Sequence, residues 1–571
     1  MYTNIRCTAP TQRTAVVDSA VALLERTMME RGNVQVVREG EAEMRLTLAI
    51  ESGIGAEGFS IRCNGPDVHV AGNDDRGLLY GVGAFLRQCA FAENGFAYSG
   101  WAGTRVPQMP VRGIYFATHF HNFYHDAPVE EVVRYVEELS LWGCNALMVW
   151  FDMHHYTGID DPDAAAMIAR LRTILRAANS VGMGAGILVL GNEGYSTSPV
   201  ELREKDAPMA YQVELCPSKP GGMKLILKWH REVLEQFADI NVEYVCLWPH
   251  DQGGCGCEQC RPWGGRGFVE VTRAMRPLVR EMFPQAKLIV STWCFDYEMD
   301  GEFEGMWRAL REDASLVDYV MADGHTEFPA YVVEHAGDVA TPILDFPEIS
   351  MTGMLPWGGF GLNPLPQYIQ GMWESSRHLL CGGFPYSEGI YEDVNKAIML
   401  QLYWDPRRPI RDIVREYVAG EWSHSHAEAL TDTLMRLGEG SGWEPARELQ
   451  VPVFAAVPAQ LPDNAPPPYD TVCYECPPID ASAQNAEAVS AAEASLPSRI
   501  SSSWRWRCLQ LRVAIERELR LSGGRPTPQS DEYFDELCDI YHAGQAESAV
   551  KPAHSRLIAG LVAAARARDC A

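Results

Sequence analysis

Between residues 109 and 405, short apolar runs alternate with amphipathic segments whose apolar positions recur at helical spacing. The apolar runs read, in chain order, VRGIYFATH, CNALMVWFD, MGAGILVLGNEG, VEYVCLWPHD, AKLIVSTWCFD, VDYVMADG, TPILDFPEIS and LLCGGFPYSEG. Eight strand–helix units in about 300 residues predict an α/β fold of the (β/α)8 TIM barrel type. A doubly wound sheet is the alternative, but that fold rarely contains eight consecutive parallel strands.

The segments on either side of the predicted barrel follow other patterns. Residues 1–108 combine an amphipathic helix near 16–32, strands at 44–50 and around a turn in 59–72, and a second helix capped by Asn73 or Asp74. This combination predicts a small α+β domain. Residues 406–571 predict a mainly helical C-terminal region that contains a Pro-rich stretch at 451–483.

Composition and charge narrow the choice of partners. The chain is 47% hydrophobic and 22% charged, which is typical of a globular protein. Its net charge of -28 argues against nucleic acids and anionic membranes, because both are bound by clustered lysine and arginine. The first residues lack the apolar centre of a signal peptide, and no apolar run approaches a membrane span. We therefore expect a cytoplasmic protein without a membrane partner, and the oligomeric state stays open, a homodimer included.

Carboxylates and aromatic residues gather where the predicted strands end, which is the end that carries the active site in barrels of this type. Aromatic faces stack on sugar rings, and two carboxylates that flank a glycosidic bond can hydrolyse it. We expect Asp251 and Glu348, at the ends of strands four and seven, to form the catalytic pair, with Glu388 of strand eight in reserve. The expected substrate-binding residues are Arg112, His119, His121, Trp150, Asp152, Glu193, His250, Gln252, Trp293, Asp323, Trp357 and Tyr386.

Other reaction classes have weaker support. The sequence contains no nucleophile elbow, no P-loop and no dinucleotide fingerprint, so we expect no organic cofactor. His119 and His121 form an H-x-H pair on strand one that could bind the metal of a barrel metallohydrolase. Strands four to six offer no suitable lysine or histidine set to complete such a site.

The segment GCGCEQC places Cys255, Cys257 and Cys260 directly after strand four. Three thiols are one short of a structural zinc site, and Cys216, in the insertion after strand three, is the expected fourth ligand, with Cys294 the second choice. The alternative is a set of free, buried thiols. A further pair, Cys473 and Cys476, remains unassigned.

Several stretches resemble known glycosidase families. The segment GFSIRCNGPDVHVAGNDDRGLLYGVGAFLR resembles the N-terminal domain of family 20 β-hexosaminidases, α-glucuronidases and α-N-acetylglucosaminidases, and MPVRGIYF resembles their first barrel strand. The helical tail resembles that of the last two families. The segment from ELCPSKP to CGCEQC is similar to a less characterised bacterial family.

This resemblance implies an exo-acting glycoside hydrolase that removes a terminal N-acetylhexosamine from an oligosaccharide or glycoside. A terminal uronic acid is the alternative substrate, and a non-catalytic carbohydrate-binding barrel is the alternative function. Family 20 enzymes carry adjacent Asp and Glu at the end of strand four, where this sequence has Asp251 and Gln252. An amide cannot act as the acid, so either Asp251 is the acid or it orients the acetamido group and the acid lies elsewhere.

Overall fold

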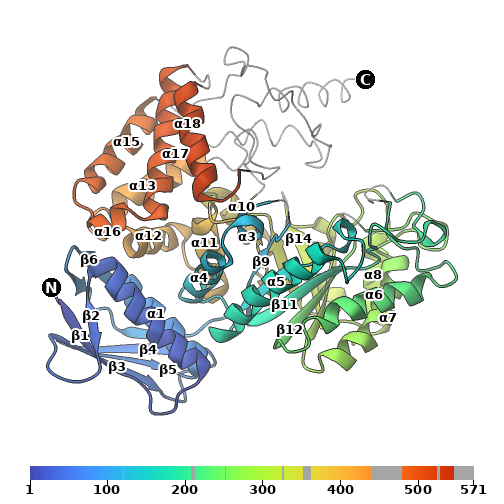
Figure 1. Ribbon diagram of the computed structural model, residues 1–571, viewed down its shortest axis with the longest axis horizontal. Helices are drawn as coiled ribbons and strands as arrows, with labels where there is room; N and C mark the ends of the chain where they lie inside the picture. The colour runs from blue at the N-terminus through green and yellow to red at the C-terminus, as the bar shows by residue number, and fades with distance from the viewer. Residues whose placement is uncertain are drawn as a thin grey trace.

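The computed structural model describes residues 1–119, 121–207, 212–250, 253–324, 327–350, 362–439, 479–523 and 527–544. At residues 323, 479 and 480 it describes the backbone alone. Figure 1 shows three parts. They are an N-terminal α+β part, a barrel, and a group of C-terminal helices that lies beside the barrel.

The N-terminal part is built on a sheet with the strand order β2-β1-β3-β5-β4-β8. Its strands and helices are β1 (Asn4–Thr8), α1 (Ala15–Gly32), β2 (Gln35–Val37), β3 (Met44–Ile50), β4 (Phe59–Asn64), β5 (Asp67–Gly72), α2 (Asp75–Arg87) and β8 (Gly103–Arg105). A separate hairpin joins β6 (Cys89–Ala92) to β7 (Gly95–Tyr98). Helix α2 begins as predicted, because the Asp74 side chain accepts a hydrogen bond from the Gly77 backbone N–H.

The central part is a closed parallel (β/α)8 barrel, as predicted. Its strands are β9 (Val111–Phe116), β10 (Ala146–Trp150), β11 (Gly184–Leu190), β12 (Val242–Trp248), β13 (Lys287–Ser291), β14 (Tyr319–Gly324), β15 (Ile343–Pro347) and β16 (Leu380–Gly383). Strand β9 pairs with both β10 and β16, which closes the barrel. A short continuation of the eighth strand, β17 (Tyr386–Ser387), returns to β9 two residues after β16 ends.

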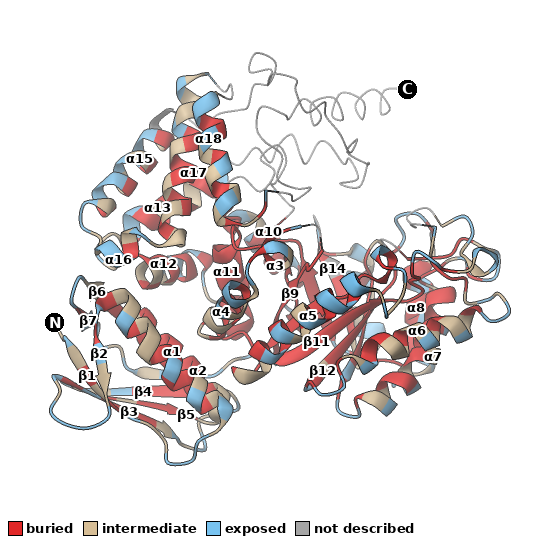
Figure 2. Ribbon diagram, viewed as in Figure 1, coloured by how far each residue is buried: buried red, intermediate tan, exposed pale blue. Residues whose placement is uncertain are grey.

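Helices alternate with these strands. They are α3 (Phe123–Asp126), α4 (Val129–Ser140), α5 (Pro162–Ser180), α6 (Gly222–Glu235), α7 (Gly267–Met282), α8 (Glu302–Glu312), α9 (Ala330–His335), α10 (Pro366–Ser376) and α11 (Asp393–Trp404). The strands are almost entirely buried, since the helices cover their outer face and side chains fill the interior (Figure 2). This double burial explains why the strands read as continuous apolar runs.

The C-terminal helices of the described chain are α12 (Ile410–Glu421), α13 (Ala427–Glu439), α15 (Ile479–Glu493), α16 (Ser498–Ser501), α17 (Trp504–Leu521) and α18 (Pro528–Ile540). Arg505 of α17 connects them to the barrel, because its guanidinium pairs with Asp393 of α11 at 2.7 Å and with Glu138 of α4 at 2.8 Å. The predicted Pro-rich stretch lies largely outside the described residues. No helix in the described ranges is both long and apolar enough to cross a membrane.

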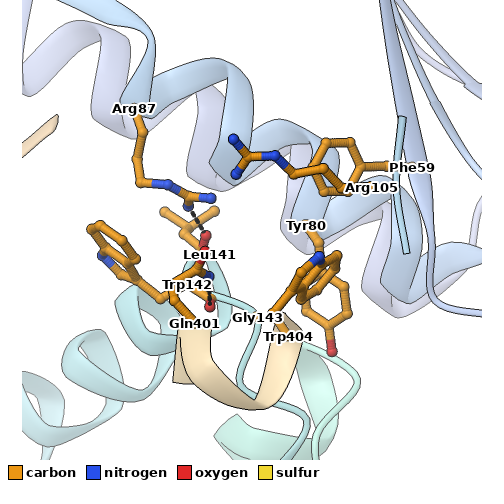
Figure 3. A pocket seen from close by; sticks show the side chains of 9 residues that line it. All are labelled: Phe59, Tyr80, Arg87, Arg105, Leu141, Trp142, Gly143, Gln401 and Trp404. Atoms are coloured by element: carbon orange, nitrogen blue, oxygen red, sulfur yellow. Dashed lines mark hydrogen bonds between the residues drawn. The ribbon is translucent and has the colours of Figure 1, made fainter. Parts of the chain in front are cut away.

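A small cavity lies where the N-terminal part meets the barrel (Figure 3). Its walls include Arg87 and Tyr80 of α2, Trp142 after α4 and Trp404 of α11. Its volume of about 10 Å³ has room for a single water molecule at most. The cavity is a packing defect between two parts of the chain, and the candidate site lies elsewhere.

Candidate active site

The carboxyl ends of the barrel strands enclose a wall of aromatic side chains. The Trp248 and Trp293 rings stack with their centroids 5.5 Å apart, and Phe346 packs edge-on against Trp248 at 4.9 Å. Tyr386 continues the wall, 5.9 Å from Phe346. All four belong to the cluster of buried residues that fills the barrel interior. The wall offers flat apolar faces next to the polar groups at the strand ends.

Two buried carboxyl groups lie close to Tyr386. The Tyr386 hydroxyl donates a hydrogen bond to Glu388 Oε1 at 2.8 Å, and Tyr391 donates to the other oxygen at 3.3 Å. Glu348 pairs with Tyr386 through an isolated backbone bridge, and its Oε1 accepts the Ser350 backbone N–H at 2.7 Å. Burial and the two neighbouring carboxylates raise the pKa of Tyr386 well above its ordinary value, so Tyr386 stays a hydrogen-bond donor. The structure therefore brings the predicted residues Glu348, Glu388 and Tyr386 together.

A second polar group surrounds Glu193, which follows β11 and is fully buried. Its carboxyl contacts the Trp150 indole N–H at 3.4 Å and His154 Nδ1 at 3.0 Å. Burial, reinforced by Asp152, raises the pKa of Glu193 well above its ordinary value. Burial also lowers the pKa of His154 to about 4. Through these contacts Glu193 holds both the indole edge of Trp150 and the imidazole of His154.

His119 and Asp152 border the same group. The His119 ring packs edge-on against Trp150 at 4.7 Å, and burial lowers its pKa well below the ordinary value. Asp152 is buried and pairs with the exposed His155 at 2.5 Å. The predicted residues His119, Trp150, Asp152 and Glu193 thus lie on one side of the barrel mouth, which is the open end where the carboxyl ends of the strands meet.

The side chain of His250, just after β12, contacts residues of the loops after β12 and β13. Its Nε2 lies 2.8 Å from Glu302 Oε1, and Glu302 also accepts the Gly264 backbone N–H at 2.7 Å. Asp296 helps to hold the first residue of α8, because its side chain accepts the Glu302 backbone N–H at 2.6 Å. These three residues fix the loops after β12 and β13, so we assign His250 a positioning role.

Arg112 corrects one expectation, because it lies at the start of β9, at the opposite end of the barrel from the mouth. Its guanidinium pairs with Glu57 and donates to the Gly143 carbonyl at 2.9 Å. It therefore joins the N-terminal part to the barrel. Asp345 of β15 also points away from the interior, because it accepts a hydrogen bond from Tyr403 of α11.

His121 lies apart from His119 despite their H-x-H spacing. Its backbone has a φ of 51°, its side chain is 52% exposed, and its ring stacks on His125 at 4.5 Å. Among the described residues, the groups with metal-ligand spacing place His121 with His125 and Asp126, and none contains His119. This arrangement does not favour a metallohydrolase site built on the H-x-H pair.

Four of the predicted residues cannot be placed. Asp251, Gln252 and Trp357 lie outside the described residues, as does the side chain of Asp323. The same holds for Cys473 and Cys476. The role of Asp251 therefore remains a prediction from the sequence.

The four cysteines expected to act together do converge. The sulfur atoms of Cys216, Cys255, Cys257 and Cys260 all lie within 4.8 Å of one another. Cys216 Sγ is 3.7 Å from Cys257 Sγ and 3.9 Å from Cys260 Sγ. Cys294, the second choice for the fourth position, belongs to none of the metal-ligand groups in the described part of the chain.

The sequence analysis missed several residues of this site. Trp248 and Phe346 belong to the aromatic wall, Tyr391 binds Glu388, and Glu302 orients His250. Strand alternation could have identified Trp248 and Phe346, because they share a face with other interior residues. Tyr391 lies three residues from Glu388, in the same segment after the eighth strand, whereas Glu302 lies 52 residues from His250 and nothing in the local sequence indicates their contact.

Comparisons with known proteins agree with this fold. No protein-family model and no curated protein matches the sequence. Among solved structures, a family GH115 4-O-methyl-α-glucuronidase with specificity for decorated arabinogalactans superposes with a TM-score of 0.59 at 12% identity, covering 97% of this chain and 80% of that chain. A GH138 enzyme targeting pectin rhamnogalacturonan II gives 0.53 at 12% identity and covers 99% of both chains.

A third similar structure is the GH20 β-N-acetylhexosaminidase from Streptomyces coelicolor A3(2). Its TM-score is 0.52 at 15% identity, with 73% of this chain and 91% of that chain covered. At these identities the likeness establishes a shared fold, a TIM barrel with flanking parts.

Proposed function

We propose that this protein is an exo-acting glycoside hydrolase, with a terminal N-acetylhexosaminide as its substrate. The observation that carries the proposal is the pair of buried carboxyl groups, Glu348 and Glu388, close to Tyr386 at the aromatic end of the barrel. Aromatic faces bind the apolar side of a sugar ring, and carboxylates supply the acid, base or nucleophile of glycosyl transfer. Three structures of similar fold are themselves glycosidases.

In the proposed mechanism, Asp251 acts as the general acid and Glu348 as the carboxylate that assists departure of the sugar. Glu388 is held by two tyrosine hydroxyls and is the alternative to Glu348. Glu193 positions Trp150 through the indole N–H. If Asp251 instead orients an acetamido group, the acid is a different carboxyl group of the mouth.

The charge of the mouth favours a neutral sugar over a uronic acid. Recognition of a carboxylate substrate normally uses arginine or lysine. Among the described residues that directly follow the eight strands, none is lysine or arginine. A uronate would therefore meet several carboxyl groups at the described strand ends and no lysine or arginine directly after them, which supports the N-acetylhexosaminide as the lead substrate.

A panel of aryl glycosides tests the proposal, with wild type beside Asp251→Asn, Glu348→Gln and Glu388→Gln. Loss of an acid–base or nucleophilic carboxyl group should lower kcat by about 10²- to 10⁴-fold on the preferred substrate. Glu327→Gln is the control, because Glu327 is an exposed carboxylate after β14 and should leave kcat unchanged. Sugar binding without turnover of any glycoside would favour a carbohydrate-binding barrel.

A further inference from the structure

We propose that Cys216, Cys255, Cys257 and Cys260 form a tetrathiolate Zn²⁺ site that locks the loop after β11 to the loop after β12. Three of these side chains are at most 2% exposed, and Cys257 is half-buried. This proposal is independent of the proposed glycosidase activity. Its test is the metal content of the protein, which can be measured without any substrate.

The distances between the sulfur atoms match zinc coordination. A Zn–S bond of about 2.3 Å in a tetrahedron places the sulfur atoms about 3.8 Å apart. The observed separations from Cys216 are 3.7 Å to Cys257 and 3.9 Å to Cys260. A disulfide would require about 2.05 Å, and all four residues are free cysteines. The four sulfur atoms are therefore spaced for a central ion.

The number and kind of ligands indicate a structural rather than a catalytic ion. Four thiolates fill a tetrahedral shell and leave no position for water or substrate. Soft sulfur ligands select zinc over the hard cations magnesium and calcium. The Ser218 hydroxyl lies 3.0 Å from Cys216 Sγ and 3.4 Å from Cys257 Sγ, where it can donate a hydrogen bond to a thiolate.

The backbone shows that the two loops are in direct contact beside the sulfur atoms. The Gly256 N–H donates a hydrogen bond to the Lys205 carbonyl at 2.7 Å. The backbones are so close that a Cβ at Gly256 would lie 2.1 Å from the backbone carbonyl oxygen of Asp206. The Asn192 side chain joins both loops, since its amide N–H group donates to the carbonyls of Leu215 and Gly254 at 2.8 and 2.6 Å. Asn192 directly precedes Glu193, so the contacts that join the two loops also hold the backbone next to the candidate active site.

Metal analysis tests the site directly. Wild-type protein purified without chelator, or refilled with Zn²⁺ under reducing conditions, should contain about one zinc per chain, and Cys216→Ser should contain almost none. Cys63→Ser is the control, because Cys63 lies on β4 of the N-terminal sheet and should leave the zinc content at one. Wild-type protein without zinc after refilling, or with an equimolar amount of iron instead, would overturn the proposal.

Two further measurements on the wild-type protein keep the test decisive if Cys216→Ser fails to fold. Titration of chelator-treated protein with Co²⁺ should produce thiolate-to-metal absorption that saturates at one equivalent. Hydrogen exchange should speed up on metal removal in peptides covering 200–207, 212–222 and 253–262, with the N-terminal sheet unchanged. Unchanged exchange in those peptides would show that the ion does not lock the loops, whatever its stoichiometry.

Discussion

At the scale of single residues, Asp345 is the titrating group with the clearest effect on stability. Its carboxyl is buried beside Tyr403, and burial raises its pKa to about 7. In the unfolded chain the group ionises near its ordinary value of 3.8. The folded state therefore binds this proton more tightly, and the group's favourable contribution declines as pH rises from about 4 to about 7.

We expect Asp345→Asn to remove this pH dependence. The amide keeps an oxygen that can accept the Tyr403 hydrogen bond, but it has no proton to lose. Relative to wild type, the free energy of unfolding of the variant should rise by about 2 kcal/mol between pH 5 and pH 7, because each pH unit between the two pKa values contributes about 1.36 kcal/mol and the change levels off near pH 7. Chemical denaturation of both proteins at several pH values measures the difference, and a constant difference across this range would contradict the raised pKa.

Tyr386 provides a second prediction at this scale, which rests on the proposed function. Tyr386→Phe removes the hydroxyl that donates to Glu388 at 2.8 Å and leaves the aromatic ring in place. A hydrogen bond to a charged group contributes about 1.5–3 kcal/mol, so kcat/KM should fall about 10- to 100-fold. Steady-state kinetics on the best aryl glycoside measures it. An unchanged rate would show that this hydrogen bond does not contribute to the reaction, and circular dichroism checks that the variant is folded.

At the scale of helices and strands, α2 packs closely against the end of the barrel helix α4, and Gly83 makes this close approach possible. A Cβ at Gly83 would lie 2.1 Å from the backbone oxygen of Leu141, which also accepts a hydrogen bond from Arg87. Gly83→Ala should therefore destabilise the fold by about 1–3 kcal/mol, although alanine favours helix.

Gly371 of α10 is the matched control for this substitution. It is exposed, and a Cβ there would meet nothing within 4 Å. Gly371→Ala should stabilise by about 0.5–1 kcal/mol, because alanine loses less conformational freedom than glycine on folding. Thermal denaturation separates the two cases, and equal shifts of the same sign would contradict a steric role for Gly83.

The barrel was predictable because burial on both faces makes each strand an apolar run, while each covering helix shows helical periodicity. The short strands β1, β2, β6, β7 and β8 were not predicted, since three to five residues give too little alternation. Site positions could be predicted from strand ends. The direction of each side chain could not, as His250 and Arg112 show, because it depends on partners such as Glu302 and Glu57 that lie far away in the sequence.

At the scale of the whole molecule, buried ion pairs hold the C-terminal helices against the barrel. Arg505 is 12% exposed and pairs with Asp393, which also accepts hydrogen bonds from Tyr135 and Tyr417. Removing the arginine leaves a buried carboxylate with less compensation. Truncation of one partner of such a pair typically costs about 3–5 kcal/mol.

We therefore expect Arg505→Met to lower the free energy of unfolding by about 3 kcal/mol or more. Arg499→Met is the control, because Arg499 is an exposed arginine on the neighbouring helix α16 and should change stability little. Denaturant titration compares the two variants. A similar small effect for both would mean that the helices are held by apolar packing alone.

The bonds from Asn192 to the loops after β11 and β12 also bear on how this barrel can be re-engineered. The loops that follow the strands carry the active site of TIM barrels, and changing these loops changes their chemistry. Here the Asn192 side chain donates hydrogen bonds to the carbonyls of both Leu215 and Gly254. Replacing either loop alone would therefore leave polar groups of the other loop without a hydrogen-bond partner. The two loops therefore form one structural unit, and a graft that carries both with Asn192 should fold where a single-loop graft fails.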